Sequence, residues 1–255
     1  MESDRFVRLL DDMIYERRKM TSPLYQTILA GRATQRLLQN FCIHRFPIKN
    51  VWTRNLMGVG SRLPDYDLRV ELVTNLYEEE TGALTGGGRH VQTFLDFGES
   101  VGVPQDVVVN APLLPQTRRL VDHNLNACGN TNVHFTEGVA SVLLLMEGQP
   151  PIVDRAGKSM LSVMRDVYGL PPKGYEFFVH HASSDTGSEA VSALEDEHAD
   201  VMREILRRYC DSEELQDKAM ASLRRALELR HQHFDAILGN FYDESEPPLR
   251  LRLAA

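Results

Sequence analysis

A mostly apolar run over residues 139–146, closing on the carboxylate of Glu147, constrains this chain more than any other feature. Glu147 lies four residues after Leu143 and seven after Ala140, so on a helix it continues their apolar face. Burying a bare charge costs several kcal/mol, so an ionisable group on such a face is paired, protonated or bound to a metal. The alternative is a solvated glutamate at a helix C-terminus, where it opposes the helix dipole. The run therefore predicts a helix with a candidate functional carboxylate at its end.

Helical periodicity covers almost the whole chain, and no strand-period alternation is visible. Pro47 lies inside a long predicted helix, where it predicts a kink. The pattern favours a single all-α domain with a bundle-like core over residues 1–245, followed by a flexible tail over 246–255. The predicted helices cover residues 3–19, 23–31, 34–59, 65–80, 90–101, 116–129, 134–147, 154–168, 174–208 and 212–242.

Composition limits the classes of partner. The 255 residues carry a net charge of -8 and no basic stripe, which argues against a nucleic-acid partner. No apolar run is long enough to span a membrane, and the N-terminus has no signal-peptide pattern. Cys42, Cys128 and Cys210 are an odd number without a CxxC motif, so we expect three reduced thiols in a cytoplasmic protein.

Three consecutive glutamates, Glu78–Glu80, end one of the predicted helices. The third, Glu80, lies four residues after Leu76 and seven after Val73, so it continues the face that we take as inward. Glu79 falls beside Glu80, and Glu78 turns outward. The following glycine loop lets the chain reverse, which would bring Glu80 and His90 to one cavity. A solvated acidic helix end with a surface histidine is the alternative.

A second candidate group follows an aromatic pair. His181 and Asp185 are four residues apart and share a helix face, one turn after Phe177 and Phe178. The run 183–188, Ser-Ser-Asp-Thr-Gly-Ser, contains poor helix formers. Because metal binding and local folding are linked, a metal could order this segment.

Glu195 and His198 fall near the same face if the helix continues. Their Glu-x-x-His spacing also occurs in ferritin-like di-iron bundles, but the other candidate pair, His134 and Glu137, is in the reverse order. We therefore rank a ferritin-like topology low. Carboxylate and imidazole groups on separate helices, with no cysteine cluster, favour non-haem iron or manganese over structural zinc.

A resemblance to a known family is carried by five stretches: LAGRAT at 29–34, IHRFPIK at 43–49, LYEEETG at 76–82, FLDFGESVG at 94–102 and GYEFF at 174–178. In these stretches the chain resembles the heme-oxygenase-like superfamily, and the resemblance extends over about residues 5–240. That superfamily holds pyrroloquinoline quinone synthase, thiaminase II and the heme-oxygenase-like di-iron oxidases. The resemblance implies a bundle of about seven core helices with its site in the middle.

The di-iron branch is similar in having Glu then His on adjacent helices, Glu on a later helix, and His-x3-Asp-x2-His after an aromatic pair. The resemblance therefore implies as metal ligands Glu80, His90, Glu147, His181 and Asp185. The last histidine of the pattern falls on Ser188, which is a poor iron ligand. The second iron would then be weakly held, or Glu195 or His198 would replace the missing group, or the site would be mononuclear.

The resemblance implies an O2-using non-haem iron oxidase or oxygenase with two Fe2+ per chain. Its substrate would be a small molecule such as an amino acid, amine or fatty acid, and we expect a homodimer. One alternative is a cofactorless ring oxidase like the quinone synthase, for which Tyr175 and Arg45 match as substrate contacts but Val179 and Glu80 do not. Thiaminase II needs a cysteine nucleophile beside a glutamate, and Cys128 has no convincing setting for it. The third alternative is a helical interaction module with a degenerate site.

Overall fold

The computed structural model describes residues 1–149, 157–180 and 189–251, of which residues 180 and 189–197 are described by their backbone alone. The named elements of these residues are all helical, and an isolated β-bridge joins Thr34 to Pro248, so the all-α prediction is confirmed. The α-helices are α1 Ser3–Glu16, α2 Pro23–Leu29, α3 Gln35–Asn50, α4 Trp52–Gly60, α5 Tyr66–Thr81, α6 His90–Ser100, α7 Gln105–Asn110, α8 Pro115–Gly129, α9 Phe135–Gly138, α10 Leu144–Glu147, α11 Met160–Ser162, α12 Pro172–His180, α13 Glu189–Tyr209 and α14 Glu213–Phe241.

Three short segments of other helical geometry complete the chain: the 3-10 turn η1 Lys19–Thr21 and the π-helical segments η2 Val139–Leu143 and η3 Val163–Val167. The segment η2 joins α9 to α10, so the helix predicted over 134–147 is present as one run with a π-bulge. π-bulges are rare and often occur at functional sites. This one ends at Leu143, about one turn before Glu147.

Local sequence explains most helix ends. The side chains of Ser22, Thr34 and Asp65 each accept a hydrogen bond from a backbone N–H in the first turn of the helix they precede. Gly82 ends α5 in the left-handed conformation, at φ 66°, and a Cβ there would lie 2.6 Å or less from the carbonyl oxygens of Gly87 and Gly88. Only glycine therefore suits the tight reversal between α5 and α6.

The structure differs from the sequence prediction in three places. The helix predicted over 34–59 is divided at Val51, four residues after Pro47, into α3 and α4. The helix α7 was not predicted. The described part of the expected tail lies against the domain, because Leu249 N–H donates to Ala33 and Leu251 N–H donates to the carbonyl oxygen of Tyr168.

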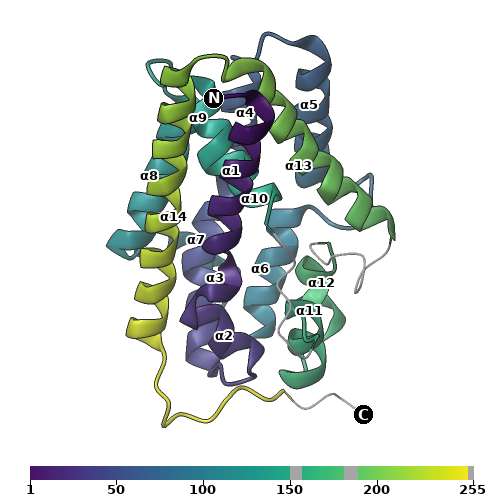
Figure 1. Cartoon of the computed structure of the whole chain (residues 1–255). Helices are drawn as coiled ribbons and strands as arrows, with labels where there is room; N and C mark the ends of the chain where they lie inside the picture. The colour runs from purple at the N-terminus through teal and green to yellow at the C-terminus, as the bar shows by residue number, and fades with distance from the viewer. Residues whose placement is uncertain (150–156, 181–188, 252–255) are drawn as a thin grey trace.

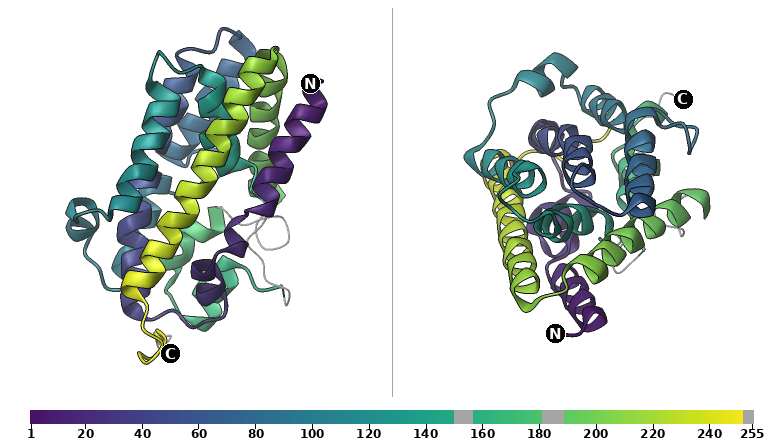
Figure 2. Two further views of the ribbon diagram at one scale, coloured as in Figure 1. Left: turned by 60° about the vertical axis from the view of Figure 1, so that its left-hand side comes forward. Right: turned by 90° about the horizontal axis from the view of Figure 1, so that it is seen from above.

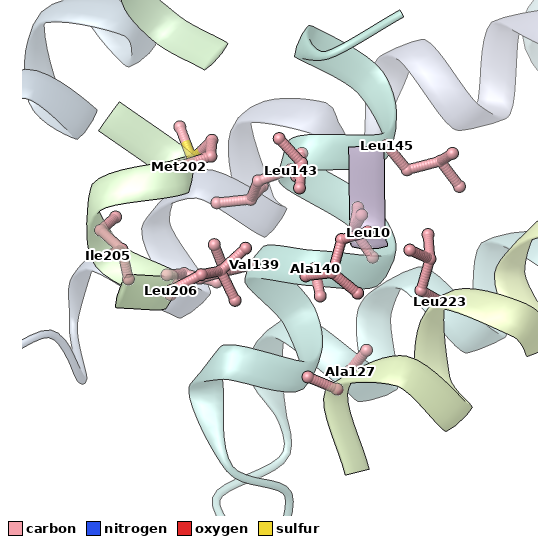
Figure 3. Packing of buried hydrophobic residues seen from close by; sticks show 14 of the residues in the cluster. Leu10, Ala127, Val139, Ala140, Leu143, Leu145, Met202, Ile205, Leu206 and Leu223 are labelled. Atoms are coloured by element: carbon pink, nitrogen blue, oxygen red, sulfur yellow. The ribbon is translucent and has the colours of Figure 1, made fainter. Parts of the chain in front are cut away.

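The bundle has two large apolar clusters, and α14 contributes residues to both. Helix α14 runs along the length of the bundle (Figures 1 and 2). The first cluster is drawn in Figure 3 and joins α1, α4, α5, α10 and α13, with Leu10, Leu143 and Ile205 among its fully buried members. The second joins α2, α3, α6 and α12 through the aromatic contacts of Phe94, Phe97 and others. The helices that carry the candidate site come from both clusters, so the site lies where the clusters meet. In the described residues no helix has the length and apolar character needed to cross a membrane.

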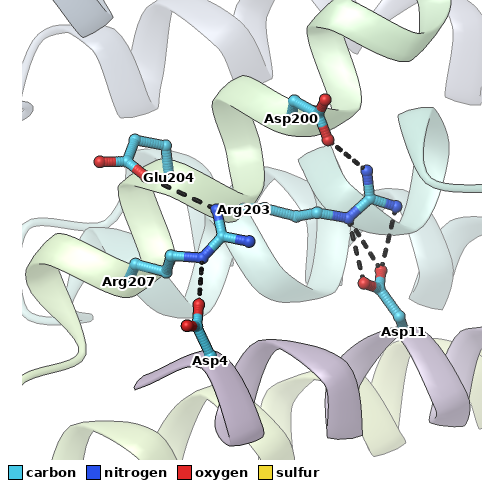
Figure 4. Close-up of polar contacts among 6 residues, drawn as sticks. All are labelled: Asp4, Asp11, Asp200, Arg203, Glu204 and Arg207. Carbon is cyan, nitrogen blue, oxygen red and sulfur yellow. Dashed lines mark hydrogen bonds and ion pairs between the residues drawn. The ribbon is translucent and has the colours of Figure 1, made fainter.

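Ion pairs tie α1 to α13 (Figure 4). The guanidinium of Arg203 binds the carboxylate of Asp11 through several hydrogen bonds of 3.0–3.3 Å. Arg207 donates to Asp4 at 2.8 Å nearer the surface. These contacts fix the position of α13, which bears Glu195 and His198.

Candidate metal centre

The buried face of α5 differs from the face that the sequence suggested. Leu68, Leu72, Asn75 and Glu78 are buried, whereas Val73 is 60% exposed. The prediction that Glu78 turns outward is therefore wrong, and so is the choice of the Val73 face as inward. The exposed apolar residues of this helix have helical spacing of their own, and they imitate a core-facing stripe: Tyr66, Val70, Val73 and Tyr77.

The three glutamates at the end of α5 have three different surroundings. Glu78 is 3% exposed and accepts hydrogen bonds from the Leu84 backbone N–H, at 2.7 Å, and from the Thr85 hydroxyl. It thereby holds the loop that returns the chain to α6. Glu80 forms an ion pair with Arg89 on the partly exposed side of the helix, with 2.7 Å between Glu80 Oε2 and Arg89 Nη2. The structure therefore does not bring Glu80 to His90, contrary to the expected juxtaposition.

Glu79 takes the position expected of Glu80. Its Oε2 lies 3.0 Å from Nδ1 of His90, the first residue of α6, and its side chain is 18% exposed. Burial alone would raise the pKa of Glu79, but the hydrogen bond from His90 and the charges of His90 and Lys49 lower it overall. Burial alone would lower the pKa of His90, but Glu79 and Glu78 raise it overall. The pair therefore consists of an ionised carboxylate and an imidazole that is readily protonated.

Glu147 is placed by α10 and by a partner on α5. Asn75, 1% exposed and four residues before Glu79, donates from Nδ2 to Glu147 Oε1 at 3.0 Å. Asn75 and Glu79 therefore share one face of α5. Burial raises the pKa of Glu147, and the charge of Glu79 raises it further, while His198 and Asn75 act in the opposite direction. This effect of Glu79 on Glu147, and the action of His198 on both, place the two carboxylates in one electrostatic environment.

Two basic residues complete the described surroundings. His198, on α13, lowers the pKa of both Glu79 and Glu147 through its charge. Lys49, at the end of α3, acts on both carboxylates in the same direction, and its Nζ lies 4.9 Å from the centroid of the Phe177 ring. Sequence analysis had not singled out Lys49 or Asn75. A polar residue on the buried face of α5 was the available signal for Asn75, but it required the correct choice of face.

The remaining predicted site residues are placed only in part. His181, Asp185 and Ser188 lie outside the described residues, and of Glu195 only the backbone on α13 is described. Tyr175 is half-buried on α12 and packs against the second apolar cluster. Arg45 is buried in α3, 4% exposed, with its guanidinium 5.4 Å from the centroid of the Phe234 ring.

The described donors suit a metal ion without by themselves completing a metal site. Within residues 1–149, 157–180 and 189–251, no group of three ligand-type side chains is arranged to hold a metal. However, Glu147 has a single described hydrogen-bond partner, Asn75, which engages only one of its carboxylate oxygens. Carboxylates and imidazole are the donors typical of non-haem iron. A cation placed between Glu79, His90 and Glu147 would supply positive charge to Glu147, whose pKa is raised by burial and by Glu79.

Sequence comparison finds curated relatives along most of the chain. A protein of Nitrosomonas europaea named 4-aminobenzoate synthase is 24% identical over 251 residues, which cover 94% of each chain. A protein of Chlamydia muridarum with the same name is 24% identical, over 72% of this chain and 74% of its own.

Solved structures agree on the fold. A TenA homologue from Pseudomonas syringae pv. tomato matches 94% of this chain and 96% of its own at a TM-score of 0.68 and 11% identity. A domain of unknown function with a heme-oxygenase-like fold from Shewanella denitrificans matches 92% of this chain and 90% of its own at a TM-score of 0.58 and 20% identity. The predicted heme-oxygenase-like fold is thereby confirmed. The sequence model of the family described as iron-containing redox enzyme matches residues 39–231, and the chain belongs to this family.

Proposed function

We propose that this protein is an O2-activating non-haem di-iron oxidase or oxygenase that acts on a small molecule. The observation that carries the proposal is the joint placement of Glu79, His90 and Glu147 on three helices of an iron-containing redox enzyme. In this assignment Glu79 replaces Glu80 as the ligand from α5. His181 and Asp185 remain the ligands proposed for the second iron, on the family pattern.

Iron, when bound, would supply the binding and reduction of O2. The protein's own residues would orient the ligands of the iron and offset part of their negative charge. Asn75 orients Glu147 by holding one of its carboxylate oxygens. Glu78 secures the loop before His90, so the imidazole is fixed relative to Glu79. Lys49 offsets part of the negative charge of the two carboxylates.

Ser188 leaves the last ligand position of the family pattern without a good donor. We propose His198 as its replacement, because its charge acts on both Glu79 and Glu147. Iron titration then separates two cases. If His198 is a ligand, His198→Ala loses one of two irons. If it is not, the native protein binds one iron weakly and Ser188→His strengthens that step.

The substrate class is a small amine, amino acid or fatty acid. The curated relatives are named 4-aminobenzoate synthase, so formation of 4-aminobenzoate is the first reaction to test. An identity of 24% does not by itself assign that reaction to this chain.

The test is reconstitution with Fe2+ without oxygen, followed by measurement of iron per chain and of O2 uptake on exposure to air. We expect close to two irons and substrate-dependent O2 uptake. Glu147→Ala should lose iron and uptake, whereas Glu228→Ala, a surface glutamate that pairs with Arg225, should keep both. O2 uptake without bound iron would favour a cofactorless oxidase, and the absence of both would favour a non-catalytic helical module.

A further inference from the structure

Two arginines are buried in the bundle without a counter-charge. Arg45 on α3 is 4% exposed and Arg230 on α14 is 3% exposed. In the described part of the chain neither guanidinium is paired with a carboxylate. Burying a charge costs several kcal/mol unless it is paired, so an unpaired arginine pair inside a core calls for a missing anion.

Arg230 keeps most of its hydrogen-bonding capacity unused. Its Nη2 donates to the backbone carbonyl oxygen of Arg17, while Nε and Nη1 are buried and have no described partner. A guanidinium binds both oxygens of a carboxylate through Nη2 together with either Nε or Nη1, and one of these two edges of Arg230 stays open beside the bond to Arg17. Burial, followed by the charge of Arg45, lowers the pKa of Arg230 to about 9, so it is still protonated at neutral pH.

The two arginines line one small cavity between α3, α8, α10 and α14. Its volume is about 20 Å³, which is room for about one water-sized group, so only the head group of a small acid would enter it. Asn124 and Ser141 add polar groups to its wall, and Ser141 belongs to the π-bulge η2. Leu145 and Met146 add apolar wall, which suits the carbon atoms next to such a head group.

The charged residues that line this cavity are both basic, and the rest of its wall is apolar or neutral. His233, fully buried on α14, has its pKa lowered by burial and then by the charge of Arg45. None of the charges that act on Arg230 in the described structure comes from a carboxylate: they come from Arg45, Tyr25 and Arg17. The cavity is therefore electrostatically suited to an anion and unsuited to an amine or a metal cation.

The cavity adjoins the candidate metal centre along two elements. On α3, Lys49 follows Arg45 by one turn, about 6 Å along the helix axis, and Lys49 acts on Glu79 and Glu147. On α10, Met146 lines the cavity and the next residue is Glu147. The cavity therefore lies close to the candidate centre along both helices.

We propose that Arg45 and Arg230 bind the carboxylate group of this protein's substrate, which is therefore an organic acid and not a simple amine. The identification of the ligand as substrate rests on the proposed function. The existence of a carboxylate site does not, because it follows from the two buried guanidinium groups and the cavity that they line.

The test uses the full chain, free of metal and loaded with Fe2+, and follows its melting temperature with sodium formate, acetate or 4-aminobenzoate. Sodium chloride at equal ionic strength is the reference. We expect a saturable rise with the carboxylates that chloride does not reproduce. Arg45→Met and Arg230→Met should each weaken apparent affinity by about tenfold or more, as expected for the loss of charged hydrogen bonds. Arg225→Met, on the exposed side of α14, is the matched control and should respond like the native protein.

The variants also separate binding from a structural role. Without added anion, Arg230→Met should melt no lower than the native protein, because it removes an unpaired buried charge. An equal rise with chloride, a rise that the arginine variants retain, or no rise at all would each overturn the carboxylate site. Carboxylate binding by a protein that fails to bind iron would overturn the proposed function and leave the site in place. Iron binding and O2 uptake without any carboxylate response would overturn the carboxylate site and leave the proposed function in place.

Discussion

Glu79 Oε2 lies 3.0 Å from His90 Nδ1, while the next residue, Glu80, pairs with Arg89 at the surface. This relationship decides which glutamate of α5 faces the candidate centre. It also makes the centre testable with two variants that differ only by one position in the chain.

We expect Glu79→Gln to lower iron affinity by at least about tenfold, because it removes a charged oxygen donor and leaves His90 without its partner. Glu80→Gln should leave iron content unchanged, since its carboxylate binds Arg89 instead. Iron per chain after reconstitution and desalting measures both. The reverse order of effects would return the ligand role to Glu80.

Alanine substitutions at two glycines, Gly58 and Gly239, should have opposite effects on stability. A Cβ at Gly58 would lie 2.6 Å from the backbone carbonyl oxygen of Cys128, so α4 and α8 can approach closely only with glycine there. We expect Gly58→Ala to lower the free energy of unfolding by roughly 1–3 kcal/mol. Gly239, near the end of α14, has no atom within 4 Å of such a Cβ, so Gly239→Ala should raise it by about 0.5–1 kcal/mol. Urea titrations of both variants check the prediction, and equal effects would contradict it.

The ion pairs between α1 and α13 predict unequal costs for two similar substitutions (Figure 4). Asp11 and Arg203 are partly buried and joined by several hydrogen bonds, whereas Asp4 and Arg207 are more exposed. Asp11→Asn should therefore destabilise by about 1 kcal/mol or more and Asp4→Asn by less than about 0.5 kcal/mol. Thermal unfolding at low and high salt distinguishes them, because salt screens the exposed pair more. A larger loss for Asp4→Asn would show that the exposed pair carries the contact.

Sequence predicted the fold well because the information it needs is local. Helical periodicity identifies most of the helices in the described chain, and the glycine loop that begins at Gly82 marks the end of α5. The short helix α7 was missed, since its six residues have too few turns to show a period. The division at Val51 was expected only as a kink at Pro47.

The site was harder to predict, because it depends on which face of α5 is buried. Val73 and Tyr77 are exposed, yet their spacing matches that of a core stripe, so sequence alone favoured the face that ends at Glu80. The true face, with Leu72 and Asn75, carries a polar residue and therefore gave a weaker apolar signal. A rotation of one residue on a helix is 100°, which is enough to exchange a ligand for a surface charge. Glu147 and His90 did not depend on this choice, and their assignment as ligands stays a prediction.

His44 predicts how stability changes with pH. It is 3% exposed, stacks on Phe241 at 5.3 Å between ring centroids, and burial lowers its pKa to about 4. In the unfolded chain the same group titrates near its ordinary value of 6.5, so between these values the unfolded state binds more protons. The stabilising contribution of neutral His44 is therefore complete above pH 6.5 and is lost as the pH falls towards 4, by about 2–3 kcal/mol. His44→Phe keeps a stacked ring without the proton site, so its free energy of unfolding should fall less over this range than that of the native protein. Carboxylates titrate over the same range in both proteins, so the difference between the two curves isolates His44, and superimposable curves would show that its folded-state pKa is not lowered.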